Sequence, residues 1–117
     1  MSKKELEKTL FRKIERLEAF EERMNVRLDN LTIKINDIDD GDFTLFGELH
    51  PRDGGTELKE KINLMCVIYN AKGEIIKKDQ YNTLFPEDFF GFEVFNFDFY
   101  EDGIIHEIGA IRIYPTK

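Results

Sequence analysis

Several residue types that common active sites require are rare in this sequence. Its 117 residues include one cysteine, two histidines and no tryptophan, and the single serine is Ser2. One cysteine cannot form an internal disulfide, and a serine in a frayed terminus is a poor hydrolase nucleophile. A glycine-rich phosphate-binding loop is also missing. These absences predict that the chain is not an enzyme and binds no cofactor.

The residues that bind soft metals are scattered along the chain. His50, Cys66 and His106 stand alone, without the close ligand spacing of a zinc site. Cys66 lies in the most apolar segment and is predicted to be a small buried residue, whereas His50 is predicted to lie on the surface. The neighbouring carboxylates Glu87 and Asp88 would suggest acid–base chemistry only if they line a deep pocket.

Long apolar runs are missing as well, so neither a signal peptide nor a membrane span is predicted, and we expect a cytoplasmic protein. The net charge of −7 is unevenly distributed. Residues 1–30 hold eight basic and seven acidic residues, and the rest of the chain holds nine basic and 17 acidic ones. Because binding to nucleic acid depends on Lys and Arg neutralising phosphates, the acidic part disfavours a nucleic-acid partner.

Residues 3–28 show the periodicity of one helix. The apolar stripe has 4-3-4-3-4 spacing, with Glu21 in one apolar place, and its other members are Leu10, Ile14, Leu17, Met24 and Leu28. A helix of this length is marginal alone, so its stripe should pack on its own domain, on a second copy or on another protein. We therefore assign residues 1–28 to an N-terminal amphipathic helix. The candidate interaction residues are Leu10, Ile14, Leu17 and Met24.

Residues 29–117 alternate between apolar and polar residues, as β-strands do. Six segments separated by turn signals follow this pattern, namely "LTIKINDI", "FTLFGELH", "KINLMCVIYN", "EIIKKDQYN", "FFGFEVFNFDFY" and "IIHEIGAIRIYP". Their spacing predicts a small antiparallel, immunoglobulin-like β-sandwich. The expected fold class is therefore mainly β, with one N-terminal amphipathic helix before the sandwich.

The fifth of these segments has an unusual aromatic pattern. Phe95, Phe97 and Phe99 share one face, whereas Phe90, Phe92 and Val94 have the opposite parity. This predicts a β-bulge, or a strand that crosses from one sheet to the other, between Val94 and Phe95. Because a base-stacking platform needs cations beside it, the stripe without Lys or Arg indicates a hydrophobic core.

The acidic turn in "DIDDGDFTLFGE" (37–48) is not an EF-hand, because Gly41 stands at a ligand position and Asp42 replaces the invariant glycine. If the strands form a simple meander, the turns at 38–42, 70–73 and 100–103 lie at one end of the sandwich. Carboxylates from two of these loops could then bind calcium. The candidate ligands are Asp37, Asp39, Asp40, Asp42, Glu101 and Asp102. Ordinary solvated turns explain the same residues.

Three segments resemble the FxLYD-type and related bacterial immunoglobulin-like modules. They are "FTLFGEL" (43–49), "CVIYNAKGEII" (66–76) and "LFPEDFFGFEV" (84–94). The last segment departs from the pattern, because Glu87 replaces a loop glycine. The resemblance implies an immunoglobulin-like fold and a non-enzymatic binding role, and it supplies no functional residues.

Two functions follow as hypotheses. The first is a non-enzymatic protein-interaction module, in which the helix or an exposed sheet edge engages a protein partner or a second copy of the chain. The alternative is a calcium-binding domain that uses the acidic loops.

Overall fold

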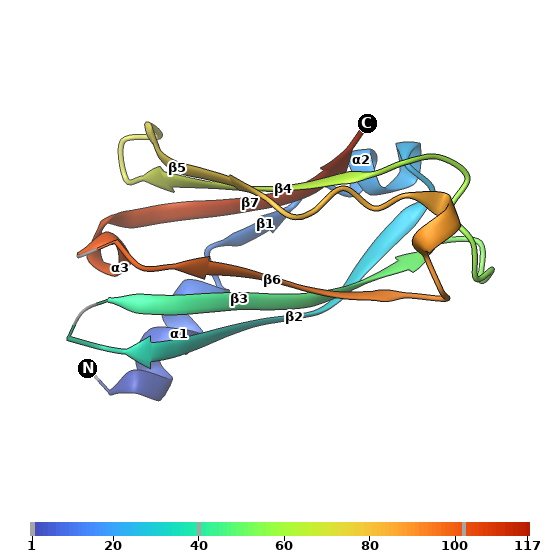
Figure 1. Cartoon of the computed structure of the whole chain (residues 1–117). Helices are drawn as coiled ribbons and strands as arrows, with labels where there is room; N and C mark the ends of the chain where they lie inside the picture. The colour runs from blue at the N-terminus through green and yellow to red at the C-terminus, as the bar shows by residue number, and fades with distance from the viewer. Residues whose placement is uncertain (1, 40, 102) are drawn as a thin grey trace.

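The computed structural model describes residues 2–39, 41–101 and 103–117, which form a two-layer β-sandwich (Figure 1). Sheet A has the order β1 (Ile14–Arg16), β7 (Ile108–Thr116), β4 (Asn63–Asn70) and β5 (Ile75–Gln80). Sheet B has the order β2 (Val26–Asp37), β3 (Asp42–Pro51) and β6 (Glu93–Phe99). The helical elements are α1 (Lys3–Phe11), α2 (Glu18–Arg23), α3 (Ile104–Glu107) and the 3₁₀ turn η1 (Pro86–Asp88). The prediction of a mainly β sandwich with an N-terminal helix is confirmed.

The strands do not form the simple meander considered for the calcium site. β3–β4, β5–β6 and β6–β7 are connected across the two sheets, so β6 pairs with β3 and β7 pairs with β4. The three acidic or polar turns nevertheless lie at one end of the sandwich, on the left in Figure 1. A Cβ atom at Gly41 would lie 3.5 Å from the backbone nitrogen of Gly103, which places the first and third turns in contact.

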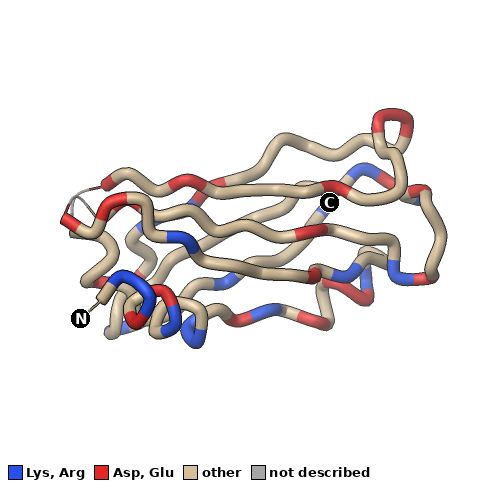
Figure 2. The backbone as a smooth tube through the Cα atoms, turned by 90° about the horizontal axis from the view of Figure 1, so that it is seen from below, with Lys and Arg blue, Asp and Glu red and all other residues tan. Residues whose placement is uncertain are grey.

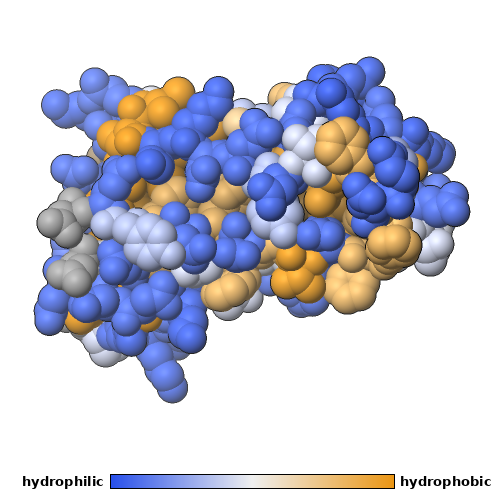
Figure 3. Space-filling view, viewed as in Figure 1, coloured by the Kyte–Doolittle hydropathy of each residue, from blue (hydrophilic) through white to orange (hydrophobic). Residues whose placement is uncertain are grey.

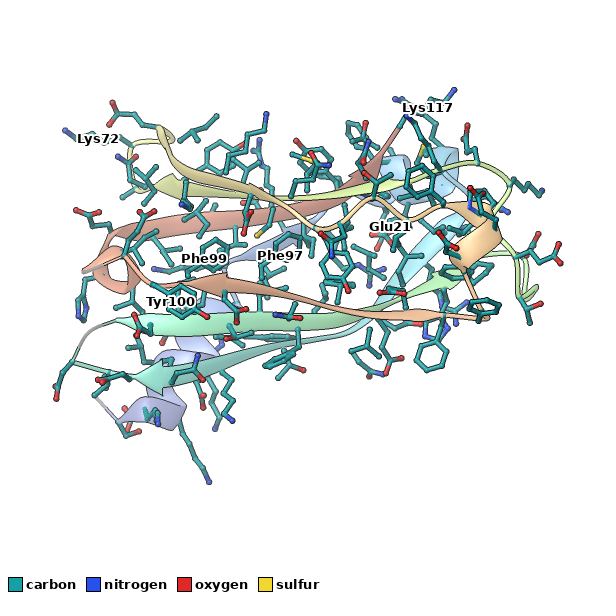
Figure 4. The ribbon with its side chains drawn as sticks, in the orientation of Figure 1. Glu21, Lys72, Phe97, Phe99, Tyr100 and Lys117 are labelled. Atoms are coloured by element: carbon teal, nitrogen blue, oxygen red, sulfur yellow. The ribbon has the colours of Figure 1, made fainter. Side chains whose placement is uncertain are left out.

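Phenylalanine rings fill the space between the sheets. Phe95, Phe97 and Phe99 of β6 are at most 2% exposed, and Figure 4 shows Phe97 and Phe99 directed between the layers. Phe99 stacks on Phe43 of β3 with ring centroids 4.9 Å apart. Gly47 makes room for this layer, because a Cβ there would overlap the Phe95 ring and lie 2.7 Å from Leu31. The prediction that the aromatic stripe is core is confirmed.

The predicted parity change between Val94 and Phe95 is wrong. The register of β3 and β6 runs without interruption from Phe43 opposite Phe99 to Leu49 opposite Glu93. Because side chains alternate strictly along a regular strand, Val94 lies on the outer face of sheet B and is 57% exposed. Phe92 is exposed too, so the second aromatic set lies outside the core.

The single helix predicted for residues 3–28 is also wrong. α1, β1 and α2 occupy this stretch, and β2 already begins at Val26. β1 pairs in parallel with β7, placing Ile14 opposite Ile111, and it thereby covers an edge of sheet A that would otherwise be unpaired. Tertiary pairing of this kind overrides helix propensity. Residues 2–28 therefore supply two helices, a short strand and the start of β2 to the structure.

Glu21 interrupts the apolar stripe because it holds these N-terminal elements together. Its side chain is fully buried and accepts hydrogen bonds from Arg16 Nη2 at 2.7 Å and from the backbone N–H of Leu28 at 2.9 Å. Arg16 Nε donates to the other carboxylate oxygen at 3.2 Å, and this hydrogen bond raises the pKa of the guanidinium. One carboxylate thus connects β1, α2 and β2 (Figure 4).

We predict that Glu21→Ala lowers the free energy of unfolding by about 2–3 kcal/mol, because it leaves the Leu28 N–H and the Arg16 guanidinium without their buried acceptor. Glu22→Ala is the matched control, since Glu22 is exposed and makes only a 3.5 Å ion pair with Arg52. Its cost should stay below about 0.5 kcal/mol. Urea unfolding of both variants measures the difference. Equal costs would show that the buried carboxylate does not hold the N-terminal elements.

Candidate functional site

The four candidate interaction residues do not form a shared exposed stripe. Leu10 and Met24 are buried in the core of their own chain, at 1% and 5% exposure. Ile14 lies in β1 and Leu17 precedes α2, and both are half-buried. Because the chain itself covers this stripe, a surface for a partner has to be sought at the edges of the sheets.

The outer edge of β2 is blocked at two points and open between them. The Leu28 N–H donates to Glu21, and the Ile35 N–H donates to Glu7 Oε2 of α1 at 2.8 Å. Both carboxylates satisfy backbone donors that an edge strand otherwise presents to solvent. Thr32 pairs with Phe46 of β3, and the register is regular from there to Ile35. Since N–H and C=O groups alternate in direction along a strand, the backbone of Ile33 points to the same open side as that of Ile35.

A groove of about 390 Å³ lies at this open stretch, between α1 and β2. Its floor is formed by Leu31, Thr32 and Ile33, and its wall is formed by Lys4, Glu7, Lys8, Phe11 and Arg12 of α1 and its C-terminal end. Figure 2 shows α1 beside sheet B, at the lower left. The groove thus combines an open strand edge with a helix face.

The helix wall of the groove is basic. Lys4, Lys8 and Arg12 recur every four residues, so they follow one face of α1. Phe11 stands among them with 51% of its surface exposed, which gives the wall an apolar element. The sign of this charge is opposite to that of the chain as a whole, whose net charge is −7. The charge of this wall favours an acidic ligand over a basic one.

These groove residues were not predicted from the sequence. The available signal was the four-residue spacing of Lys4, Lys8 and Arg12. The position of the open edge could not be read, because it depends on Glu7 reaching Ile35, 28 residues further along the chain.

The calcium candidates gain no support from the residues that the structure describes. In residues 2–39, 41–101 and 103–117, no group of three or more acidic, histidine or cysteine residues is placed to hold a metal ion. Glu101 is engaged by Lys77 Nζ at 2.7 Å, and the Asp37 side chain accepts from the Asp39 N–H at 2.9 Å. Asp42 closes the β2–β3 ladder opposite Asp37. Two further candidates, Asp40 and Asp102, lie outside the described residues.

The neighbouring carboxylates Glu87 and Asp88 line different hollows. Glu87 lines a hollow beside Phe90, whereas Asp88 lines a smaller one of about 210 Å³ beside Tyr81. In the smaller hollow the Tyr81 hydroxyl donates to Glu93 Oε2 at 2.8 Å. An acid–base pair made of Glu87 and Asp88 is therefore not supported by their positions.

The three residues that could bind a soft metal, Cys66, His50 and His106, lie in different environments. Cys66 is fully buried, as predicted, and burial raises the pKa of its thiol. His50 lies on the outer face of sheet B, where its Nε2 is 2.9 Å from Glu48 Oε1 and its ring stacks on Phe92. His106 is exposed in α3.

Comparison with known proteins yields no family for this chain. No protein-family model matches the sequence, and no curated protein or solved structure matches it significantly. The resemblance to FxLYD-type modules, and with it the immunoglobulin-like assignment, stays a prediction. No helix in the described part of the chain is long and apolar enough to cross a membrane.

Tyr81 gives the open side of the sandwich between β5 and β6 a measurable pH dependence. Burial raises the pKa of Tyr81 to about 12, and the hydrogen bond to Glu93 and its charge act in the same direction. An unfolded tyrosine titrates near 10. The folded state thus favours the neutral phenol of Tyr81. The resulting contribution to the free energy of unfolding is fully present below about pH 10 and is lost as the pH rises toward 12.

We predict that Tyr81→Phe loses less stability than the unaltered protein when the pH is raised from about 9 to about 11. Urea midpoints at the two pH values, measured for both proteins, test this. Comparing the two proteins removes the pH effects that they share, so the difference in the losses reports Tyr81. Identical losses would show that its phenol is not held neutral by the fold.

Proposed function

We propose that this chain is a non-enzymatic protein-interaction module that binds an extended, acidic segment of a partner protein in the groove between α1 and β2. The observation that supports this most is the coincidence of an open strand edge with a basic helix face. Each feature alone is common, but together they match the backbone and the side chains of one kind of ligand. The cytoplasmic location predicted from the sequence goes with this proposal and rests on the sequence alone.

The backbone of the ligand would pair with β2. Ile33 offers one N–H and one C=O on the open side, between the two points where Glu21 and Glu7 close the edge. An extended peptide that adds a strand to a sheet edge gains affinity from such main-chain hydrogen bonds. The short open stretch limits pairing to a few residues, so side chains have to supply the rest.

Side-chain contacts would select acidic and apolar residues. Lys4, Lys8 and Arg12 provide charge partners at every turn of the helix, and Arg12 can bind a carboxylate through two parallel hydrogen bonds. Phe11 and Leu31 provide apolar surface on opposite sides of the groove. An alternating peptide of acidic and apolar residues meets both requirements, since its successive side chains point in opposite directions.

The test uses a fluorescein-labelled synthetic peptide of alternating Glu and Val as the probe, with fluorescence anisotropy as the readout. We expect binding that weakens with added salt, and a dissociation constant raised by about tenfold or more in the double variant Lys8→Glu with Arg12→Glu. A peptide of alternating Lys and Val should not bind.

Lys3→Glu is the matched control, because Lys3 belongs to α1 but does not line the groove. Its effect on the dissociation constant should stay within about twofold. In amide NMR spectra the probe should shift Ile33 and leave Asn96, on the opposite edge of sheet B, unchanged. Failure of the Glu–Val peptide to bind, or equal weakening by Lys3→Glu, would contradict the proposal.

A further inference from the structure

The outer face of sheet B carries apolar side chains that the described chain leaves partly exposed. Phe46, Phe92 and Val94 are 37%, 49% and 57% exposed. Figure 3 shows apolar side chains gathered along the lower margin of the molecule, on the side of sheet B. Exposed apolar residues that are neighbours on one sheet face indicate an interaction surface, whereas single ones do not.

Side chains on this face lie in rows across the three strands. One row consists of Lys34 on β2, Thr44 on β3 and Asp98 on β6, as the two strand registers place them. The next row consists of Thr32, Phe46 and Asn96. The first row therefore has a cation, Lys34, at one end and an anion, Asp98, at the other. The second row has Phe46 on its middle strand.

We infer that this outer face is a homodimer interface, in which sheet B of one copy packs against sheet B of a second copy. The second copy is the occupant because the face is complementary to itself. A two-fold axis parallel to β3 exchanges β2 with β6 and keeps each row at its own level. It therefore brings Lys34 over Asp98 of the second copy, and Asp98 over its Lys34.

The same axis places the two Phe46 rings against each other. A two-fold interface uses one patch on both copies, so every favourable contact off the axis is made twice. Sheets that pack face to face lie about 10 Å apart, and aromatic side chains fill that space well. Thr44 and Asp98 are already ordered for this contact, because the Thr44 hydroxyl donates to Asp98 Oδ1 at 2.7 Å.

Glu48 opposes this packing in part. It follows Phe46 on the same face of β3, so the axis brings it near its own counterpart in the second copy. Its carboxylate is 2.9 Å from Nε2 of His50, which lies two residues further along β3. Removal of the Glu48 charge should therefore strengthen the dimer.

Sedimentation velocity over a concentration series, from low micromolar to sub-millimolar, tests the inference. We expect the full chain to show a monomer–dimer equilibrium. Phe46→Glu should raise the dimer dissociation constant by about tenfold or more, because it buries two like charges at the axis. Glu48→Gln should lower it. Circular dichroism establishes that each variant is folded.

Phe85→Glu is the matched control, because Phe85 is 42% exposed but lies beside η1, away from the outer face of sheet B. It should leave the dissociation constant within about twofold. Exchanging the charges of Lys34 and Asp98 gives an independent check if Phe46→Glu fails to fold. Lys34→Glu alone should weaken the dimer, and adding Asp98→Lys should restore it.

A chain that stays monomeric at every concentration overturns the inference, and so does a dimer that Phe46→Glu and Lys34→Glu leave unchanged. These outcomes do not bear on the groove between α1 and β2, since Lys8 and Arg12 are not part of this face. The two proposals can therefore fail separately.

Discussion

The structure depends on one layer of phenylalanine rings that is shared by the two sheets. Phe95, Phe97 and Phe99 are the inward side chains of a single strand, and each is almost completely buried. Burial of one such ring contributes about 1.5–3 kcal/mol, which is large beside the total stability of a small domain. The layer therefore fixes which face of β6 is turned inward. Through the registers of β6 with β3 and of β3 with β2, it also determines which side chains of sheet B lie on the outer face.

Both proposed surfaces follow from this orientation. With the odd-numbered residues of β6 inside, Val94 and Asp98 have to lie outside, and the pairing through β3 sets Lys34 and Phe46 on the same outer face. The two sheets have two outer faces and four edge strands, and a chain of this size cannot cover all of them with its own residues. α1 covers the core at one edge and leaves a groove beside β2, and the outer face of sheet B stays open.

The sequence was sufficient for the sandwich, the buried Cys66 and the aromatic core, because strand alternation and turn residues are local signals. It was insufficient where a local pattern has two solutions. The spacing of Leu10, Ile14, Leu17 and Met24 suits one long helix, yet a three-residue strand and two short helices bury Leu10 and Met24 equally well. The pairing of β1 with the edge of β7 and the hydrogen bonds of the buried Glu21 favour the second solution. Both are tertiary interactions. Val94 led to a wrong prediction for a related reason. In the sequence of a single strand, an apolar residue that lies outside the core looks like a change of strand parity.

The most direct test of this account compares two apolar residues of β6 by urea unfolding, at a concentration low enough for the chain to be monomeric. We expect Phe97→Ala to lower the free energy of unfolding by about 3–5 kcal/mol, since it opens a cavity between the sheets. Val94→Ala, three residues earlier on the outer face, should cost about 0.5 kcal/mol or less. A large cost for Val94→Ala, or a small one for Phe97→Ala, would contradict the orientation of β6 and with it both proposed surfaces.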